Sequence, residues 1–188
     1  MVRKHRIWYP GARYHITTRG IRRTALFHED EDRHEYMRLL KDAKLRMPFV
    51  LQAYRLMTNL IHLQLETIDH PPGRIIHRVH TLYASYFNNK YDYSGHVFES
   101  RYQSELLDSV RYELEVNRYI HLNPIRAEIV NDLNDYQGSS YPVYAGQRPQ
   151  SMVSTDRIFT FIPNPKVENY LQFLYAKLKD IEKYAMIE

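Results

Sequence analysis

The chain has 188 residues, of which 44% are hydrophobic, and its 26 basic and 22 acidic residues give a net charge of +4. This length and composition predict one globular domain with at most a small appendage. No long apolar run is present, the basic N-terminus lacks the apolar stretch of a signal peptide, and there are no cysteines; these features exclude a transmembrane helix, disulfides and thiolate metal sites, so we expect a cytoplasmic protein with no membrane partner.

Positive charge is concentrated at the N-terminal end of the chain. The first 23 residues contain no aspartate or glutamate, and their basic side chains are Arg3, Lys4, Arg6, Arg13, Arg19, Arg22 and Arg23. A stretch of this kind without counter-charge favours contact with nucleic-acid phosphates. The alternative is an ordinary solvated basic surface.

The first half of the chain predicts three strands and one helix. A β-rich segment over 12–18 is followed by a helix over 30–47, with Asp30 as its N-cap and acidic residues in its first turn. Pro48 stops that helix. Two further strands are predicted over 49–57 and 60–68, joined by a short connection.

The second half of the chain is predicted to be mostly helical. Apolar residues at helical spacing indicate an amphipathic helix from Arg74 to Phe87, and Asn123 with Pro124 is expected to end a later helix. The other predicted elements are an extended segment over 96–107, helices over 110–122 and 128–135, a turn-rich stretch over 138–149, a short element over 156–161 and a final helix over 167–184.

This order of elements predicts an α+β fold. A few antiparallel strands with helices mainly on one face form a two-layer sandwich, and the ferredoxin-like or RRM-like arrangement is its commonest form. The second sheet face would then be open for a ligand. We predict a domain over 1–147 and a C-terminal helical extension over 148–188, whose apolar stripe packs on the core by default, with dimerisation or DNA contact as alternatives.

One predicted strand carries an unusual row of side chains. Because side chains alternate along a strand, Leu60, His62, Gln64 and Glu66 share one face. An imidazole, an amide and a carboxylate in one row suit a metal ion. The alternative is that His62 is a buried, hydrogen-bonded structural residue, as most single strand histidines are.

Four separate stretches of the chain resemble one family. They are residues 14–20 (YHITTRG), 54–63 (YRLMTNLIHL), 94–102 (SGHVFESRY) and 118–127 (RYIHLNPIRA). Together, and in this order, they are similar to the single-tyrosine HUH transposases, most closely the REP-associated type. No single stretch would be decisive, but four in the family's order make coincidence improbable.

The resemblance implies a DNA-cutting and strand-transfer enzyme that acts on hairpins of single-stranded DNA. In this family, two strand histidines and one polar helix residue hold a divalent ion, and a tyrosine on that helix attacks a DNA phosphate. The matching residues here are His62, Asn123 and the nucleophile Tyr119, with Mg²⁺ or Mn²⁺ as the implied metal. The i, i+4 spacing of Tyr119 and Asn123 is consistent with one helix face.

The chain departs from the family pattern at Leu60, where the family has its first histidine. Leucine cannot bind a metal, so we expect weak or absent metal binding and slow or absent cleavage. His15, on a neighbouring predicted strand, is a possible substitute ligand. Gln64 and Glu66 share the His62 face but lie further along the strand.

Each assigned residue has an alternative, structural interpretation. Tyr119 would be read as a core aromatic residue of an amphipathic helix if the resemblance were absent. Asn123 precedes Pro124 and could serve to end the helix. His121 is two residues from Tyr119 and is expected to be a surface group. Our candidates for DNA-phosphate contact are Arg19, Arg22, Arg23 and Arg101, and the alternative for them is salt bridging.

Three functional hypotheses follow. The first is the transposase just described, and the second is a catalytically inactive, domesticated DNA-binding relative, which Leu60 favours. The third is an RNA-binding module that uses an open sheet face, although no RRM-type octamer is present. The resemblance allows a monomer or a homodimer, in which the tyrosine of one subunit serves the other.

Overall fold

The computed structural model describes residues 7–185, and side chains as far as Ala176. Its strands are β1 (Arg13–Arg19), β2 (Phe49–Leu56), β3 (Leu60–Thr67) and β4 (Gln103–Leu106). Its α-helices are α1 (Asp30–Arg46), α2 (Pro72–Lys90), α3 (Val110–Arg126), α4 (Tyr141–Tyr144), α5 (Asp156–Thr160) and α6 (Lys166–Ala185), and short 3-10 turns form η1 (Ile21–Arg23) and η2 (Leu133–Asp135).

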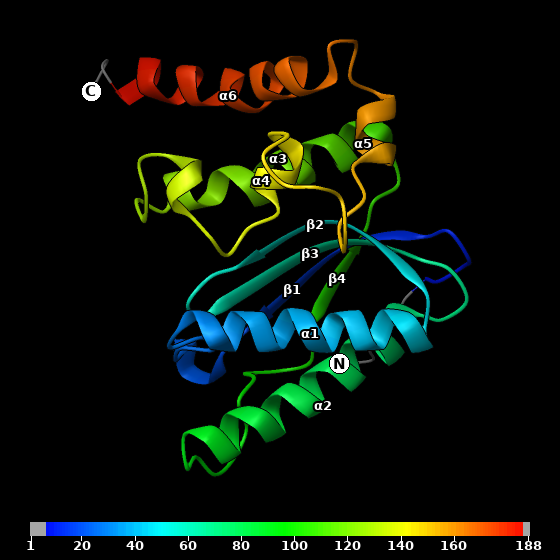
Figure 1. Cartoon of the computed structure of the whole chain (residues 1–188), viewed down its shortest axis with the longest axis vertical. Coiled ribbons are helices and arrows are strands. Elements are labelled where there is room, and N and C mark those ends of the chain that lie inside the picture. The colour runs from blue at the N-terminus through cyan, green and yellow to red at the C-terminus, as the bar shows by residue number, and fades with distance from the viewer. Residues whose placement is uncertain (1–6, 186–188) are drawn as a thin grey trace.

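Over the described residues, the four strands form one sheet in the order β2-β3-β1-β4, and all neighbouring strands run antiparallel. Helix α1 connects β1 to β2 and α2 connects β3 to β4, which is the ferredoxin-like arrangement (Figure 1). The predicted α+β class with an antiparallel sheet and C-terminal helices is confirmed. The extended segment predicted over 96–107 forms a strand only over Gln103–Leu106.

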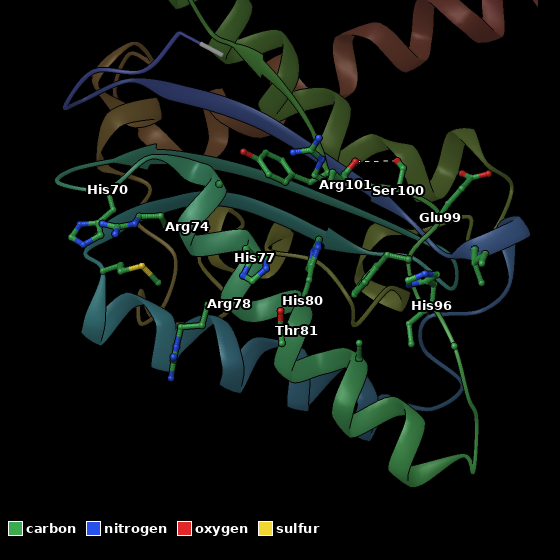
Figure 2. A pocket seen from close by; sticks show the side chains of 18 residues that line it. His70, Arg74, His77, Arg78, His80, Thr81, His96, Glu99, Ser100 and Arg101 are labelled. Carbon is green, nitrogen blue, oxygen red and sulfur yellow. Dashed lines mark hydrogen bonds between the residues drawn. The ribbon is translucent and has the colours of Figure 1, made fainter. Parts of the chain in front are cut away.

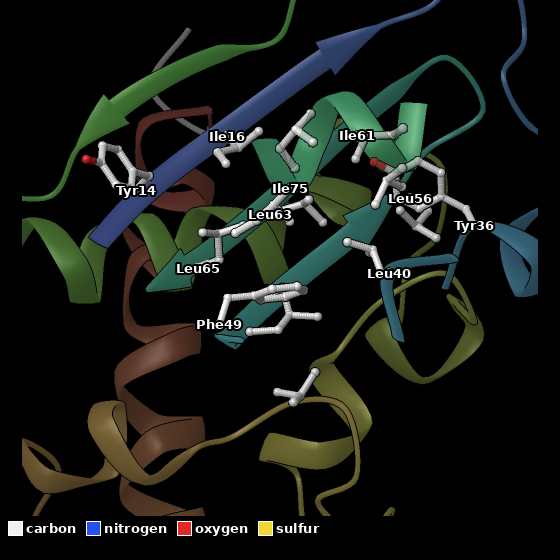
Figure 3. Packing of buried hydrophobic residues seen from close by; sticks show 14 of the residues in the cluster. Tyr14, Ile16, Tyr36, Leu40, Phe49, Leu56, Ile61, Leu63, Leu65 and Ile75 are labelled. Atoms are coloured by element: carbon white, nitrogen blue, oxygen red, sulfur yellow. The ribbon is translucent and has the colours of Figure 1, made fainter. Parts of the chain in front are cut away.

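Helices α1 and α2 cover one face of the sheet (Figure 1). Most of the strand side chains on this face are apolar and fully buried, among them Ile16, Leu63 and Leu65 (Figure 3). Leu40 of α1 and Ile75 of α2 pack against the same cluster. The alternation of side chains along β1 and β3 therefore divides the sheet into an apolar face and a second, polar face.

Helices α3, α4 and α6 lie on the polar side of the sheet (Figure 1). Helix α3 packs on β2 through a small apolar cluster that includes Ala53, Val116 and Ile120. Both faces of the sheet are therefore covered by helices, which corrects the expectation of one open face. The reason is that the third helix folds back across the sheet, where we had expected helices mainly on one face.

Helix α1 is tied to α2 by one buried carboxylate. Asp32 closes a capping box with Glu29, which takes the N-cap position one residue before the predicted Asp30. The Asp32 carboxylate also accepts hydrogen bonds from the hydroxyls of Tyr86 and Tyr91, at 2.9 and 2.7 Å, and from Lys90 Nζ at 3.0 Å. Burial alone would raise the pKa of Asp32, but these bonds hold it at about 2.

Helix α3 continues through Pro124 and ends at Arg126, beyond the predicted end at residue 122. Proline has no N–H, so the carbonyl of Ile120, four residues earlier, lacks its helical donor. The guanidinium of Arg55 on β2 donates to that oxygen from Nη1 at 3.1 Å. A side chain from the sheet thus replaces the missing backbone bond and lets the helix continue.

The C-terminal helices pack on α3. The Tyr170 hydroxyl of α6 donates to Asn117 Oδ1 at 2.7 Å and lies 2.6 Å from His121 Nδ1. His121 Nε2 is 2.7 Å from Ser140 Oγ, and the imidazole is fully buried, which corrects the expectation of a surface group. Packing on the core was the default expectation for this tail, whereas the division at residue 147 stays a prediction. In the described part of the chain, no helix is both long and apolar enough to cross a membrane.

Candidate functional site

Tyr119 of α3 lies against His62 of β3. Their ring centroids are 5.5 Å apart with the planes nearly perpendicular, and His15 of β1 is 6.1 Å from the same tyrosine ring. The two histidines are in direct contact, because His15 Nε2 is 3.0 Å from His62 Nδ1 and their rings stack. Three residues that lie far apart in the sequence therefore form one cluster between the sheet and α3.

Strand register places this cluster. His62 is opposite Thr17 and Gln64 is opposite His15, so His15 and His62 are diagonal neighbours on the polar face. Helix α3 covers this face, held by Ile120 on the helix side that packs on β2. Tyr119 precedes Ile120 and points into the edge of the same interface, where it remains partly exposed.

Arg55 completes the cluster and was not singled out by the sequence. It is opposite His62 in the β2–β3 register and is fully buried. Its Cζ lies 5.8 Å from the centre of the Tyr119 ring, and that of the exposed Arg126 lies at 5.9 Å. Burial lowers the pKa of Arg55 to about 10, while Tyr119 and Tyr136 act in the opposite direction, so the guanidinium is charged at neutral pH.

The positive charge of Arg55 affects the neighbouring histidines. Burial and then the charge of Arg55 lower the pKa of His62 to about 2. The pKa of His15 is also lowered, first by burial, with Glu105 opposing the shift. Both imidazoles are therefore neutral at physiological pH.

The structure shows which donor atoms of the predicted metal ligands are already engaged. His62 offers one unpartnered nitrogen, Nε2, because Nδ1 contacts His15. Gln64 is engaged by α3: its Oε1 accepts from Asn117 Nδ2 at 3.0 Å, and its Nε2 donates to the Glu113 carbonyl at 3.1 Å. Asn123 lies one helical turn beyond Tyr119 and is partly buried.

The other possible ligands do not complete the set. Glu66 is 3.6 Å from Arg13 in an ion pair, and Leu60 has no donor atom. Among the described residues, no group of three His, Cys, Asp or Glu side chains could hold a metal ion. The cation nearest to His62 in the strand register is Arg55, which would repel a divalent ion. The residues present do not fit the divalent metal that the resemblance implies.

The four predicted DNA-contact arginines are all exposed and lie in two adjacent segments. Ile21 N donates to the Val97 carbonyl at 3.0 Å, and Glu99 N donates to the Arg19 carbonyl at 3.0 Å. The segment with Arg19, Arg22 and Arg23 therefore runs beside the one with Arg101. The backbones of Arg22 and Arg23 have φ values of 49° and 62°, a left-handed conformation that is costly for side chains other than glycine.

A large groove lies between α2 and the segment before β4 (Figure 2). It has a volume of about 1330 Å³, and its lining includes one acidic residue, Glu99. The charged and titratable side chains on the α2 side are Arg74, His77, Arg78 and His80, and the opposite segment supplies His96 and Arg101. The sequence did not single out Arg74, His77 and Arg78, although their spacing on one helix is a signal that places them on one side of it. The groove lining includes residues of α2, which lies on the opposite side of the sheet from α3, the helix that carries Tyr119 (Figure 1).

With the geometry established, comparisons identify the family. Residues 9–123 match the family model described as IS200-like transposase. The chain belongs to this family. The matched region contains His15, His62 and Tyr119 and ends at Asn123, so the predicted transposase resemblance is confirmed at the level of the family.

Two solved structures share the fold to different extents. A REP-associated tyrosine transposase bound to a REP hairpin superposes with a TM-score of 0.67 at 15% identity, over 82% of this chain and 94% of that chain. A transposase candidate from Deinococcus radiodurans R1 has a TM-score of 0.44 at 16% identity, over 68% of this chain and 92% of that chain. A comparison with curated proteins finds no match.

Proposed function

We propose that this chain binds hairpin-forming single-stranded DNA and that Tyr119 is positioned to attack a backbone phosphate, as expected for a transposase. The observation that carries the proposal is the 5.5 Å approach of the Tyr119 ring to His62 of the same chain. Because both residues belong to the same chain, this contact favours a site formed by Tyr119 and His62 of one subunit. The family membership and the hairpin-bound relative support the same substrate class.

The residue types suit phosphoryl transfer to a phenol. Attack by the Tyr119 oxygen would form a phosphotyrosine link, which conserves the phosphodiester energy and lets a second DNA end reverse the step without ATP. His62 is a poor proton acceptor because its pKa is about 2. We therefore do not assign His62 as the general base of the proposed reaction.

The basic groove and the arginine segments are the surfaces that we assign to the DNA backbone. Their charge is largely uncompensated within the groove lining, where Glu99 is the one carboxylate. Phosphate contacts of this kind position a duplex stem and make binding salt-dependent. Arg74, Arg78 and Arg101 are the groove residues with permanent positive charge.

A catalytically inactive DNA-binding relative is the second candidate. Leu60 and the absence of a fitting metal set among the described residues favour it. The RNA-binding alternative loses its main support, because it required an open sheet face for base stacking and α3 covers that face.

A denaturing gel separates the two DNA-binding candidates. The purified chain is incubated with a labelled hairpin that carries a single-stranded flank, in parallel with Tyr119→Phe. A covalent adduct that the phenylalanine variant cannot form supports the transposase. Hairpin retention in a native gel without any adduct supports the inactive binder.

A further inference from the structure

The guanidinium of Arg55 is a buried charge without a counter-ion. It has no solvent exposure, and Nε and Nη2 have no hydrogen-bond partner. None of the ion pairs formed by the described residues includes it. Buried charges are normally paired because desolvation is costly, so an unpaired one needs an explanation.

Only one of the three guanidinium nitrogens of Arg55 makes a hydrogen bond within the fold. Nη1 donates to the Ile120 carbonyl that Pro124 leaves without a helical donor. A neutral donor would be sufficient for that bond. The two remaining nitrogens are buried and without a partner. Arg55 is opposite His62 in the strand register, and its Cζ lies 5.8 Å from the centre of the Tyr119 ring.

We propose that Arg55 supplies, in place of a divalent metal ion, the positive charge beside the Tyr119 phenol. Two observations support this assignment independently of each other: the ligand set around His62 is incomplete, and the cation that neighbours it is unpaired. Arg126, exposed and also over the Tyr119 ring, adds a second guanidinium on the side that DNA can reach.

The catalytic part of this inference rests on the proposed function. The phenol releases its proton to water, and its oxygen bonds to phosphorus as the bond from phosphorus to one flanking sugar oxygen breaks. The departing sugar oxygen takes a proton from water. Arg55 acts through Tyr119 and is therefore a positioning residue: its charge stabilises the negative charge that develops around the reacting phosphate in the transition state.

The same charge keeps a metal out. Two cations within a few ångströms of each other in a buried site repel strongly. Restoring the missing family histidine with Leu60→His should therefore fail to create a metal site while Arg55 is present. Removing the charge in the same molecule should allow the ion to bind.

Manganese binding, measured by electron paramagnetic resonance on the full chain, tests this directly. We expect negligible Mn²⁺ binding by the native chain and by Leu60→His, and binding at least about tenfold tighter by Leu60→His with Arg55→Met. The matched control is Leu60→His with Arg157→Met, which removes an arginine that pairs with Glu113. This control should behave like Leu60→His alone.

Two results would overturn the assignment: Mn²⁺ binding by Leu60→His that equals that of the Arg55→Met double variant, or tight, His62-dependent binding by the native chain. Circular dichroism verifies folding, and Arg55→Gln replaces Arg55→Met if the methionine variant does not fold. None of these readouts depends on DNA cleavage.

Adduct formation then tests the positioning role of Arg55. With EDTA present, the native chain should form the Tyr119 adduct as fast as with Mn²⁺, Arg55→Met should be at least about tenfold slower at unchanged hairpin affinity, and Arg55→Lys should recover part of the rate. Native-rate cleavage by Arg55→Met contradicts the role. If no variant forms an adduct while the manganese results hold, the cleavage proposal fails and the charge assignment stands.

Discussion

The two faces of the sheet are both buried, but they are built differently. On the face under α1 and α2, strand side chains such as Ile16, Leu63 and Leu65 are apolar and need no partners. On the face under α3 they include His62 and Arg55, which keep polar atoms without partners. A buried polar group is costly unless it is satisfied. The difference indicates that the apolar face is the main source of stability, whereas the unpaired buried charge of Arg55 on the polar face indicates function.

On the polar face, the number of hydrogen bonds that a buried side chain makes distinguishes Gln64 from Arg55. Gln64 is hydrogen-bonded to α3 through both its amide atoms, and its partner Asn117 is in turn bonded to Tyr144 and Tyr170. These residues hold the C-terminal helices on the sheet. Arg55 remains with two unpartnered nitrogens, although it lies in the same layer.

The largest effect on stability is expected on the apolar face. Leu63→Ala removes a fully buried side chain from the centre of the core and should lower the free energy of unfolding by about 2–5 kcal/mol. Urea denaturation followed by circular dichroism measures this. A loss below about 1 kcal/mol would show that the face under α1 and α2 is not the main source of stability.

Asp32, on the same side of the sheet, should make the free energy of unfolding depend on pH. Its pKa of about 2 in the folded chain is below the value of about 4 in an unfolded chain. Its contribution of about 2–3 kcal/mol is therefore fully present above about pH 4 and is lost as pH falls towards about 2. Asp32→Asn should be less stable than the native chain at pH 7, and the two should converge near pH 2. A constant difference across that range would refute the linkage.

Substitutions in the basic groove should weaken DNA binding without lowering the stability of the fold. Replacing Arg74 and Arg78 with alanine should weaken hairpin binding and reduce the slope of log affinity against log salt by about 0.7–0.9 per lost phosphate contact. Fluorescence anisotropy at several salt concentrations measures this. The control is alanine at Arg38 and Arg46, exposed on α1 with the same change in charge. An equal loss of hairpin affinity in the control variant would show that the effect comes from net charge alone.

We expect Arg55→Met to cause the smallest change in unfolding free energy. Its comparison with Leu63→Ala contrasts a polar-face residue with an apolar-face residue. The variant loses the bond to the Ile120 carbonyl, worth about 0.5–1.5 kcal/mol, but also removes an unpaired buried charge. We expect the unfolding free energy to stay within about 1 kcal/mol of the native value. A loss as large as that of Leu63→Ala would make Arg55 a structural residue.

Local patterns were sufficient to predict most of the fold. The alternation over β1 and β3 and the helical spacing of α1 and α2 predicted these elements to within about two residues at most ends, because their apolar residues face one continuous core. The family resemblance supplied Tyr119 and His62, and the structure brings them together. Their chemical roles remain predictions.

Arg55 was missed because its orientation depends on a β-bulge. Leu51 is opposite Leu65 on the apolar face, but the register shifts between Leu51 and Ala53. The extra residue reverses the alternation and turns Ala53 and Arg55 to the polar face. Simple alternation from Leu51 would have placed Arg55 among the apolar side chains. The bulge has no sequence signal that we recognised.

His121 and the covered sheet face were missed for a related reason. Helix α3 is buried both against the sheet and against α6. His121 was expected to face solvent, but its two ring nitrogens contact Tyr170 and Ser140. The contact depends on segments about 20 to 50 residues away in the chain. A periodicity analysis of one helix cannot detect such a partner.

The covalent adduct between this chain and a labelled DNA hairpin is the most direct test of the account. With EDTA present, the native chain and Tyr9→Phe, which alters an exposed tyrosine, should form the adduct, and Tyr119→Phe should form none. Mapping the attached nucleotide by mass spectrometry should place it on Tyr119. An adduct that persists in Tyr119→Phe, or one that forms on another tyrosine, would contradict the account.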